Sequence, residues 1–191
     1  MGAPELHALV DPVVVSLPRG AVSVAIEIAG ALDAPLTVMP VEDLATPGRP
    51  EYVVGAVAEN AIHVIDARAL AALGVTEESL AVRVAEATSR IARLSKLYRG
   101  ESHGTVAFCS RPVVVVDDGS ATTPALEAVA VALARHNVER LILVTPMPPD
   151  EWPQGYENVH ADGMALIGTW YDDRTAPSDE VAARMLHDYA P

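Results

Sequence analysis

Four consecutive valines followed by two aspartates restrict most strongly what this chain can fold into. The run from Val113 to Val116 is β-branched and uncharged, which predicts a strand buried on both faces at the centre of a parallel sheet. Asp117 and Asp118 follow where this strand should end. Ligands of open α/β sheets bind just beyond the carboxyl ends of the strands, so the acidic pair is expected at a functional site.

A helix is expected directly after the acidic pair. The small residues Gly119, Ser120 and Ala121 lead to two threonines, 122 and 123, either of which can cap a helix, and Pro124 suits the first helical position. The N-terminus of such a helix offers free N–H groups and a positive dipole end to an anion. A metal or phosphate site of another doubly wound domain, for example of flavodoxin-like type, is an alternative reading of the same residues.

The rest of the chain continues the alternation of strands and helices. A strand over 13–17, the loop Pro18-Arg19-Gly20 and a helix over 21–32 repeat the order strand, tight loop, helix. Further strands are expected over 36–41, 53–57, 62–65, 140–145 and 164–167. Further helices are expected over 67–73, after the cap Thr76 as far as Arg99, and after the cap Ser178, where the helix carries Val181, Met185 and Leu186.

Taken together, these segments resemble the type I phosphoribosyltransferases, in particular a subgroup of predicted phosphoribosyltransferases. The resemblance implies an α/β fold with a Rossmann-like, mostly parallel sheet flanked by helices. It also implies a single domain over 1–191, with hood or cap elements at about 42–66 and 146–175. The segments that carry the resemblance are Ser16-Leu17-Pro18-Arg19-Gly20, Val54-Gly55-Ala56-Val57-Ala58-Glu59, Leu97-Tyr98-Arg99-Gly100, Val115-Val116-Asp117-Asp118-Gly119, Trp170-Tyr171-Asp172 and Ser178-Asp179-Glu180-Val181.

The resemblance further implies transfer of phosphoribosyl from phosphoribosyl pyrophosphate to a small, nitrogenous acceptor, with Mg²⁺ carried mainly by that substrate. Asp117 and Asp118 would hold the ribose hydroxyls and could touch the Mg²⁺. The segment 100–111 would be the lid over the reacting sugar. The remaining substrate contacts that it implies are Arg19 and Gly20 for the diphosphate, Gly119, Ser120, Ala121, Thr122, Thr123 and Ala125 for the 5′-phosphate, and Trp170 and Tyr171 for the acceptor.

Five residues depart from the family pattern, and each departure weakens anion binding. Thr123 stands where a glycine would let the backbone approach phosphate, Pro124 lacks an N–H donor, and Ala125 lacks a hydroxyl. Glu42 and Asp43 stand where the subgroup carries a basic pair. The simplest interpretation of these two acids is that they face solvent; if they face the site instead, they would repel pyrophosphate.

Two alternatives therefore stay open beside the transferase. The first is a repurposed enzyme that acts on a less charged molecule, in which Asp117, Asp118, Glu42 or His103 would serve in acid–base chemistry. Trp152, Trp170 and Tyr171 would then wall an apolar pocket. The second is a non-catalytic ligand sensor.

Composition limits the partners. The formal net charge of −13 argues against nucleic acid, whose binding needs basic surface. No apolar run reaches the roughly 18 residues of a membrane span, so a cytoplasmic protein is expected. The expected partner is a small-molecule substrate, and a homodimer is an open possibility.

Overall fold

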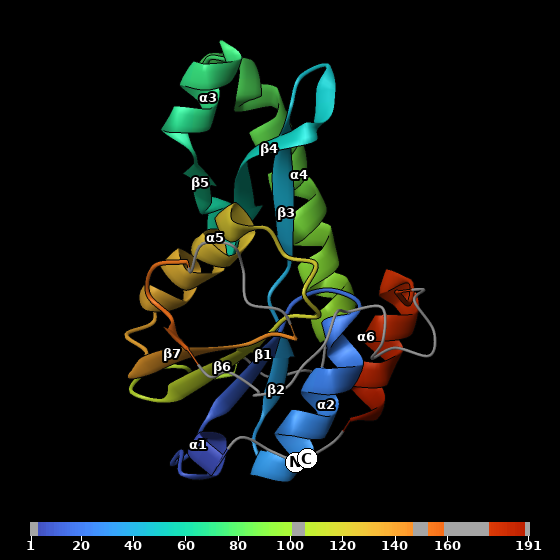
Figure 1. The fold of residues 1–191 in the computed structure, drawn as a ribbon. Coiled ribbons are helices and arrows are strands. Elements are labelled where there is room, and N and C mark those ends of the chain that lie inside the picture. The colour runs from blue at the N-terminus through green and yellow to red at the C-terminus, as the bar shows by residue number, and fades with distance from the viewer. Residues whose placement is uncertain (1–3, 101–105, 147–152, 159–175, 190–191) are drawn as a thin grey trace.

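The computed structural model describes residues 4–100, 106–146, 153–158 and 176–189. Figure 1 shows a lower layered body and an upper hood, which the long helix α4 connects. The strands are β1 Val13–Ser16, β2 Leu36–Val38, β3 Val41–Thr46, β4 Arg49–Ala58, β5 His63–Ile65, β6 Pro112–Val116, β7 Arg140–Val144 and β8 Glu157–Asn158. The helices are α1 Pro4–His7, α2 Ala21–Leu32, the 3₁₀ turn η1 Glu59–Ala61, α3 Ala67–Leu73, α4 Glu77–Arg99, α5 Thr123–Ala134 and α6 Asp179–Asp188.

The lower body is an α/β layer structure, as the sequence predicts. Its five-stranded sheet has the order β2-β1-β6-β7-β8, and every pairing is parallel. The valines of β6 are fully buried. Val113 and Val115 pack toward α5, whereas Val114 and Val116 pack toward α2 on the other face. Burial on both faces explains why this strand has no polar alternation.

The ends of the main helices follow local signals in the sequence. Thr122 caps α5 and accepts a hydrogen bond from the Ala125 amide at 3.2 Å, with Pro124 in the first turn. Thr76 caps α4 in the same way, and Gly74 ends α3 in the left-handed conformation. The predicted bounds of α2, α3 and α4 are therefore confirmed.

The hood is a three-stranded antiparallel sheet in the order β3-β4-β5. The strands expected over 53–57 and 62–65 correspond to β4 and β5, which pair antiparallel with η1 between them. The strand expected over 36–41 is wrong in its extent, because the chain leaves the parallel sheet after Val38. The last contact is the Met39 amide to the Ser16 carbonyl, and Pro40 has no N–H to continue the ladder. Val41 then begins β3 of the hood.

Other differences concern the two ends of the chain. In α6, Val181 is 37% exposed, whereas Ala182, Ala183 and Leu186 are buried. Small residues here allow α6 to pack closely against α2 and α4. The strand β8 and the short helix α1 were not predicted. The strand expected over 164–167 and most of the cap expected at 146–175 lie outside the described residues.

Within the described ranges, none of the helices combines the length and the apolar character that crossing a bilayer requires.

Candidate active site

The register of the central sheet brings two loops to the same edge. Ser16 of β1 lies opposite Val116 of β6, and the Leu17 amide donates to the Val116 carbonyl at 2.9 Å. The loop Pro18-Arg19-Gly20 and the acidic pair therefore emerge side by side at the carboxyl ends of neighbouring parallel strands. A cavity of about 430 Å³ lies between them, within the range of small-molecule sites.

Gly20 and Asp118 touch directly. A Cβ added to Gly20 would lie 1.8 Å from the Asp118 Oδ2 atom, so that no larger residue fits while Asp118 keeps its place. The φ angle of Gly20 is −66°, which any residue can adopt, so the requirement is for space alone. On its other oxygen, Asp118 accepts a hydrogen bond from the Ser120 amide at 3.0 Å. The acidic pair and the Arg19-Gly20 loop thus form one contiguous wall.

Asp117 is the buried member of the acidic pair, with only 5% of its surface exposed, and it lines the cavity. Its carboxylate accepts hydrogen bonds from the Gly119 amide at 2.9 Å, the Ala121 amide at 3.2 Å and the Thr145 hydroxyl at 3.1 Å. Burial raises the pKa of Asp117 above its ordinary value, and the neighbouring charge of Asp118 raises it further. The three hydrogen bonds oppose this shift without cancelling it.

The raised pKa of Asp117 predicts how stability depends on pH. The pKa of Asp117 is higher in the folded than in the unfolded chain. Asp117 therefore stabilises the fold when the pH is below 3.8, the ordinary pKa of an aspartate. That contribution is lost as pH rises through the folded pKa. We therefore expect the free energy of unfolding of Asp117→Asn, relative to wild type, to increase between about pH 4 and pH 7. Urea unfolding at several pH values measures this difference, and a difference that stays flat or falls would contradict the assignment.

The loop after the acidic pair has few amides left for a ligand. The N–H groups of Gly119, Ser120 and Ala121 are used by the two aspartates, and the Ala125 N–H is used by the Thr122 hydroxyl. Pro124 has no N–H. Within the described residues, the N–H groups of Thr122 and Thr123 have no protein acceptor. The predicted phosphate loop therefore offers two free amides at the start of α5.

A carboxylate from the hood also reaches this loop. The Thr122 hydroxyl donates to Asp43 Oδ1 at 2.7 Å, across a sequence separation of 79 residues. Desolvation raises the pKa of Asp43; the hydrogen bond from Thr122 lowers it, and the charge of Glu42 raises it further. Both acids line the cavity, and Asp43 is at the same time exposed, so the prediction that the two acids face solvent holds only in part.

Glu42 differs from Asp43 in that its charge is compensated. It forms an ion pair with Arg90 of α4, whose Nε donates to the carboxylate at 2.8 Å. The remaining uncompensated charge of β3 near the loop belongs to Asp43.

The last helix supplies a side chain that sequence analysis missed. Asp179, at the first position of α6, lines the cavity and accepts a hydrogen bond from the Tyr98 hydroxyl. Burial and this carboxylate both raise the pKa of Tyr98, so the phenol stays protonated at neutral pH. The segment Ser178 to Val181 is part of the family resemblance, which was the available signal, but nothing local indicates that α6 packs back onto the site.

Arg19 is the basic residue of the described cavity wall. Its φ angle of 85° is in the left-handed region, which a non-glycine residue adopts only at a cost of order 1 kcal/mol or more. The side chain is exposed and lines the same cavity as Asp117, Asp43 and Asp179. Arg19 thus lines the cavity together with several acidic residues, and its backbone is strained.

Several predicted site residues lie outside the described part of the chain. These are the acceptor contacts Trp170 and Tyr171, the alternative residues Trp152 and His103, and positions 101–105 of the expected lid. Of the other predicted site residues, the structure places Arg19, Ser120, Ala121, Thr122, Ala125 and Asp117 on the cavity wall. Gly20 and Asp118 contact each other beside it, and neither these two nor Gly119 and Thr123 belong to the described lining. Among the described residues, no group of three or more acidic, histidine or cysteine side chains is arranged to hold a metal ion.

The fold agrees with what comparison with known proteins shows. The model of the phosphoribosyl transferase domain matches residues 8–167, so the chain belongs to the phosphoribosyltransferase family.

Individual relatives extend this agreement. The chain is 31% identical over 185 residues to "Putative phosphoribosyl transferase Rv0571c" of Mycobacterium tuberculosis strain H37Rv, and equally to its counterpart in strain CDC 1551. The match covers 91% of this chain but only 41% of those proteins, so the chain spans about two fifths of the curated relatives' length. Among solved structures, the protein TT1426 from Thermus thermophilus superposes with a TM-score of 0.71 at 30% identity, covering 98% of this chain and 93% of that one.

Proposed function

We propose that the protein transfers the phosphoribosyl group of phosphoribosyl pyrophosphate to a small nitrogenous acceptor. The observation that supports this most directly is the contact between Gly20 and the Asp118 carboxylate. That contact joins the loop proposed for the diphosphate to the acids proposed for the ribose over one cavity of about 430 Å³. A donor that carries both groups on one sugar fits this arrangement.

In this proposal, the protein positions the substrate and stabilises charge. The bond from the anomeric carbon to the diphosphate oxygen breaks, and the electron pair leaves with the diphosphate beside Arg19. The acceptor nitrogen forms the new bond and releases its proton to solvent. Asp117 and Asp118 would hold the ribose hydroxyls and stabilise the positive charge that develops on the ring. The protein needs no nucleophile of its own.

The carboxylates fit a magnesium ion that arrives with the substrate. Mg²⁺ prefers oxygen ligands and commonly uses one or two carboxylates together with substrate phosphates. Asp118 is half-exposed beside Gly20 and would be the protein ligand of this ion. The ion would supply charge neutralisation for the leaving diphosphate.

Calorimetric titration with Mg²⁺ and phosphoribosyl pyrophosphate tests this proposal. We expect saturable binding by the wild type. Asp118→Asn should weaken it at least about tenfold, because a hydrogen bond to a charged group is worth roughly 1.5–3 kcal/mol. Circular dichroism of the variant serves as the control for folding. Absence of binding by the wild type, or equal binding by the variant, would contradict the proposal.

A second candidate function is favoured by the hydrogen bond between Asp43 and Thr122. The Asp43 carboxylate of β3 contacts the loop, and its negative charge would oppose a bound phosphate. Within the described loop, only the backbone amides of Thr122 and Thr123 remain to attract a phosphate. A repurposed enzyme acting on a less charged molecule would have this geometry. Under this alternative, calorimetry with phosphoribosyl pyrophosphate gives no heat for the wild type.

A further inference from the structure

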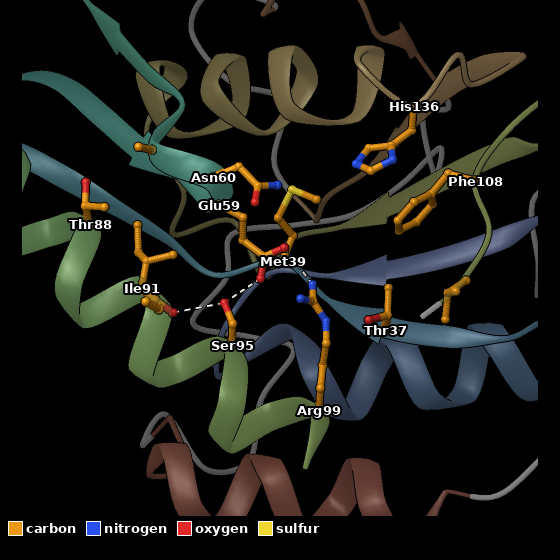
Figure 2. Close-up of a pocket in the computed structure, with 13 residues that line it drawn as sticks. Thr37, Met39, Glu59, Asn60, Thr88, Ile91, Ser95, Arg99, Phe108 and His136 are labelled. Atoms are coloured by element: carbon orange, nitrogen blue, oxygen red, sulfur yellow. Dashed lines mark hydrogen bonds and ion pairs between the residues drawn. The ribbon is translucent and has the colours of Figure 1, made fainter. Parts of the chain in front are cut away.

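A second cavity, of about 560 Å³, lies on the other side of the β2–β3 connection. It is enclosed by the edge strand β2, the turn η1, the middle of α4, the loop before β6 and the end of α5, and its described lining shares no residue with that of the first cavity. Figure 2 shows side chains from these separate elements pointing into the same space. Most of the wall is apolar, with a few fixed polar groups, as in many small-molecule sites.

An ion pair fixes the floor of this cavity. The buried Glu59 carboxylate accepts hydrogen bonds from Arg99 Nη2 at 2.6 Å and from the Ser95 hydroxyl (Figure 2). The same Arg99 nitrogen donates to the Val38 carbonyl at 3.2 Å. One nitrogen therefore makes both contacts, and Arg99 is also part of the cavity lining. Because Glu59 neutralises Arg99, the floor carries donors without a net charge.

The turn η1, which carries Glu59, also provides a side-chain amide next to this ion pair. Asn60 and Ala61 have φ angles of 58° and 57°, two successive left-handed residues without a glycine. A left-handed alanine costs roughly 1–2 kcal/mol, and such strain gathers at functional sites. The turn is closed by the Ala58 amide donating to the Ile62 carbonyl at 2.7 Å. Figure 2 shows the Asn60 amide turned into the cavity by this conformation.

The third wall is aromatic and polarisable. The rings of Phe108 and His136 have centroids 5.2 Å apart and are tilted by 56°. The Met39 side chain lies between them and Asn60 in Figure 2. Aromatic rings and thioethers make favourable contacts with a flat, unsaturated ring.

We propose that this second cavity binds an uncharged, planar nitrogen heterocycle of the size of a nucleobase. The side-chain amide of Asn60 has a hydrogen-bond donor beside an acceptor, which matches the edge of such a ring. Arg99 can donate a further hydrogen bond from the cavity floor. Phe108, His136 and Met39 contact its faces. The neutral Glu59–Arg99 pair provides no surplus positive charge for a phosphate, so the ligand is the free base rather than the nucleotide. The site is separate from the reaction proposed above and does not depend on it.

Titration calorimetry of the full chain with adenine, hypoxanthine, cytosine and adenosine monophosphate tests this. We expect at least one free base to bind at least about tenfold more tightly than the nucleotide, a difference of about 1.4 kcal/mol. Asn60→Asp keeps a residue that tolerates left-handed φ but adds a charge and removes a donor, and it should weaken base binding at least about tenfold. Ala92→Trp, on the exposed cavity face of α4, should abolish binding by filling the space.

Ala81→Trp is the matched control, because Ala81 is also exposed on α4 but does not line the cavity. It should bind the base as the wild type does. The proposal is overturned if none of the bases binds, if the nucleotide binds as tightly as the base, or if Ala92→Trp leaves base binding intact. A further outcome also overturns the proposal: the wild type binds no base but self-associates, and Ala92→Trp does not self-associate. In that case a second copy of the chain occupies the cavity.

Discussion

Replacing Gly20 with alanine is expected to disable the candidate active site. The new Cβ would lie 1.8 Å from Asp118 Oδ2, so the carboxylate must rotate away and lose its hydrogen bond from the Ser120 amide. Such overpacking costs roughly 1–3 kcal/mol of stability. Under the proposed function, binding of Mg²⁺-phosphoribosyl pyrophosphate should fall more than about tenfold, since Asp118 would lose the position proposed for holding the ribose hydroxyls. Urea unfolding and calorimetry measure the two effects.

Two further variants make the Gly20 result specific. Gly30 lies in α2, and a Cβ added there would have no atom within 4 Å. Gly30→Ala should therefore raise the free energy of unfolding by about 0.5–1 kcal/mol. In the double variant Gly20→Ala with Asp118→Ala, the obstructing carboxylate is absent, so the stability cost of the alanine should disappear. A Gly20→Ala protein as stable as wild type, with unchanged affinity, would contradict the observed contact.

Neutralising Asp43 is expected to have the opposite effect on binding. Asp43→Asn retains an oxygen that can accept the hydrogen bond from Thr122, but removes the negative charge next to the two free amides of the loop. We expect the affinity for Mg²⁺-phosphoribosyl pyrophosphate to rise about tenfold, or about 1.4 kcal/mol, at low ionic strength. The gain should shrink as salt is added, because screening weakens the repulsion that the variant removes.

Glu51→Gln provides the matched control for this charge effect. Glu51 is exposed on β4 and does not line the cavity, while its substitution changes the net charge by the same amount. Its affinity should equal that of the wild type within about twofold, since exposed charges beyond about 10 Å are screened. An equal gain in both variants would mean that overall charge, and not the position of Asp43, governs binding.

The parts of the fold that were predictable carry local signals. The β6 valines indicate burial on both faces, and Thr76, Gly74 and Pro124 mark helix ends through capping and backbone geometry. These signals act over a few residues, so the sequence alone contains them. The pairing of the two loops at one sheet edge was predictable in the same way, because parallel neighbouring strands present their carboxyl ends together.

The features that were missed depend on contacts between distant segments. Asp43 reaches Thr122 because Pro40 ends the β2 pairing and the chain turns into the hood. Asp179 reaches the cavity because the alanines of α6 allow close packing on α2 and α4. Neither the hydrogen bond of Asp43 nor the packing of α6 has a signature within its own segment.

The most direct measurement of the central claim is a crystal structure of the protein grown with Mg²⁺ and phosphoribosyl pyrophosphate. The account predicts the ribose hydroxyls within about 3 Å of the Asp118 carboxylate, with the 5′-phosphate at the Thr122 and Thr123 amides and the diphosphate beside Arg19. A ligand bound elsewhere, or an empty cavity with the Asp43–Thr122 hydrogen bond intact at saturating ligand, would contradict it.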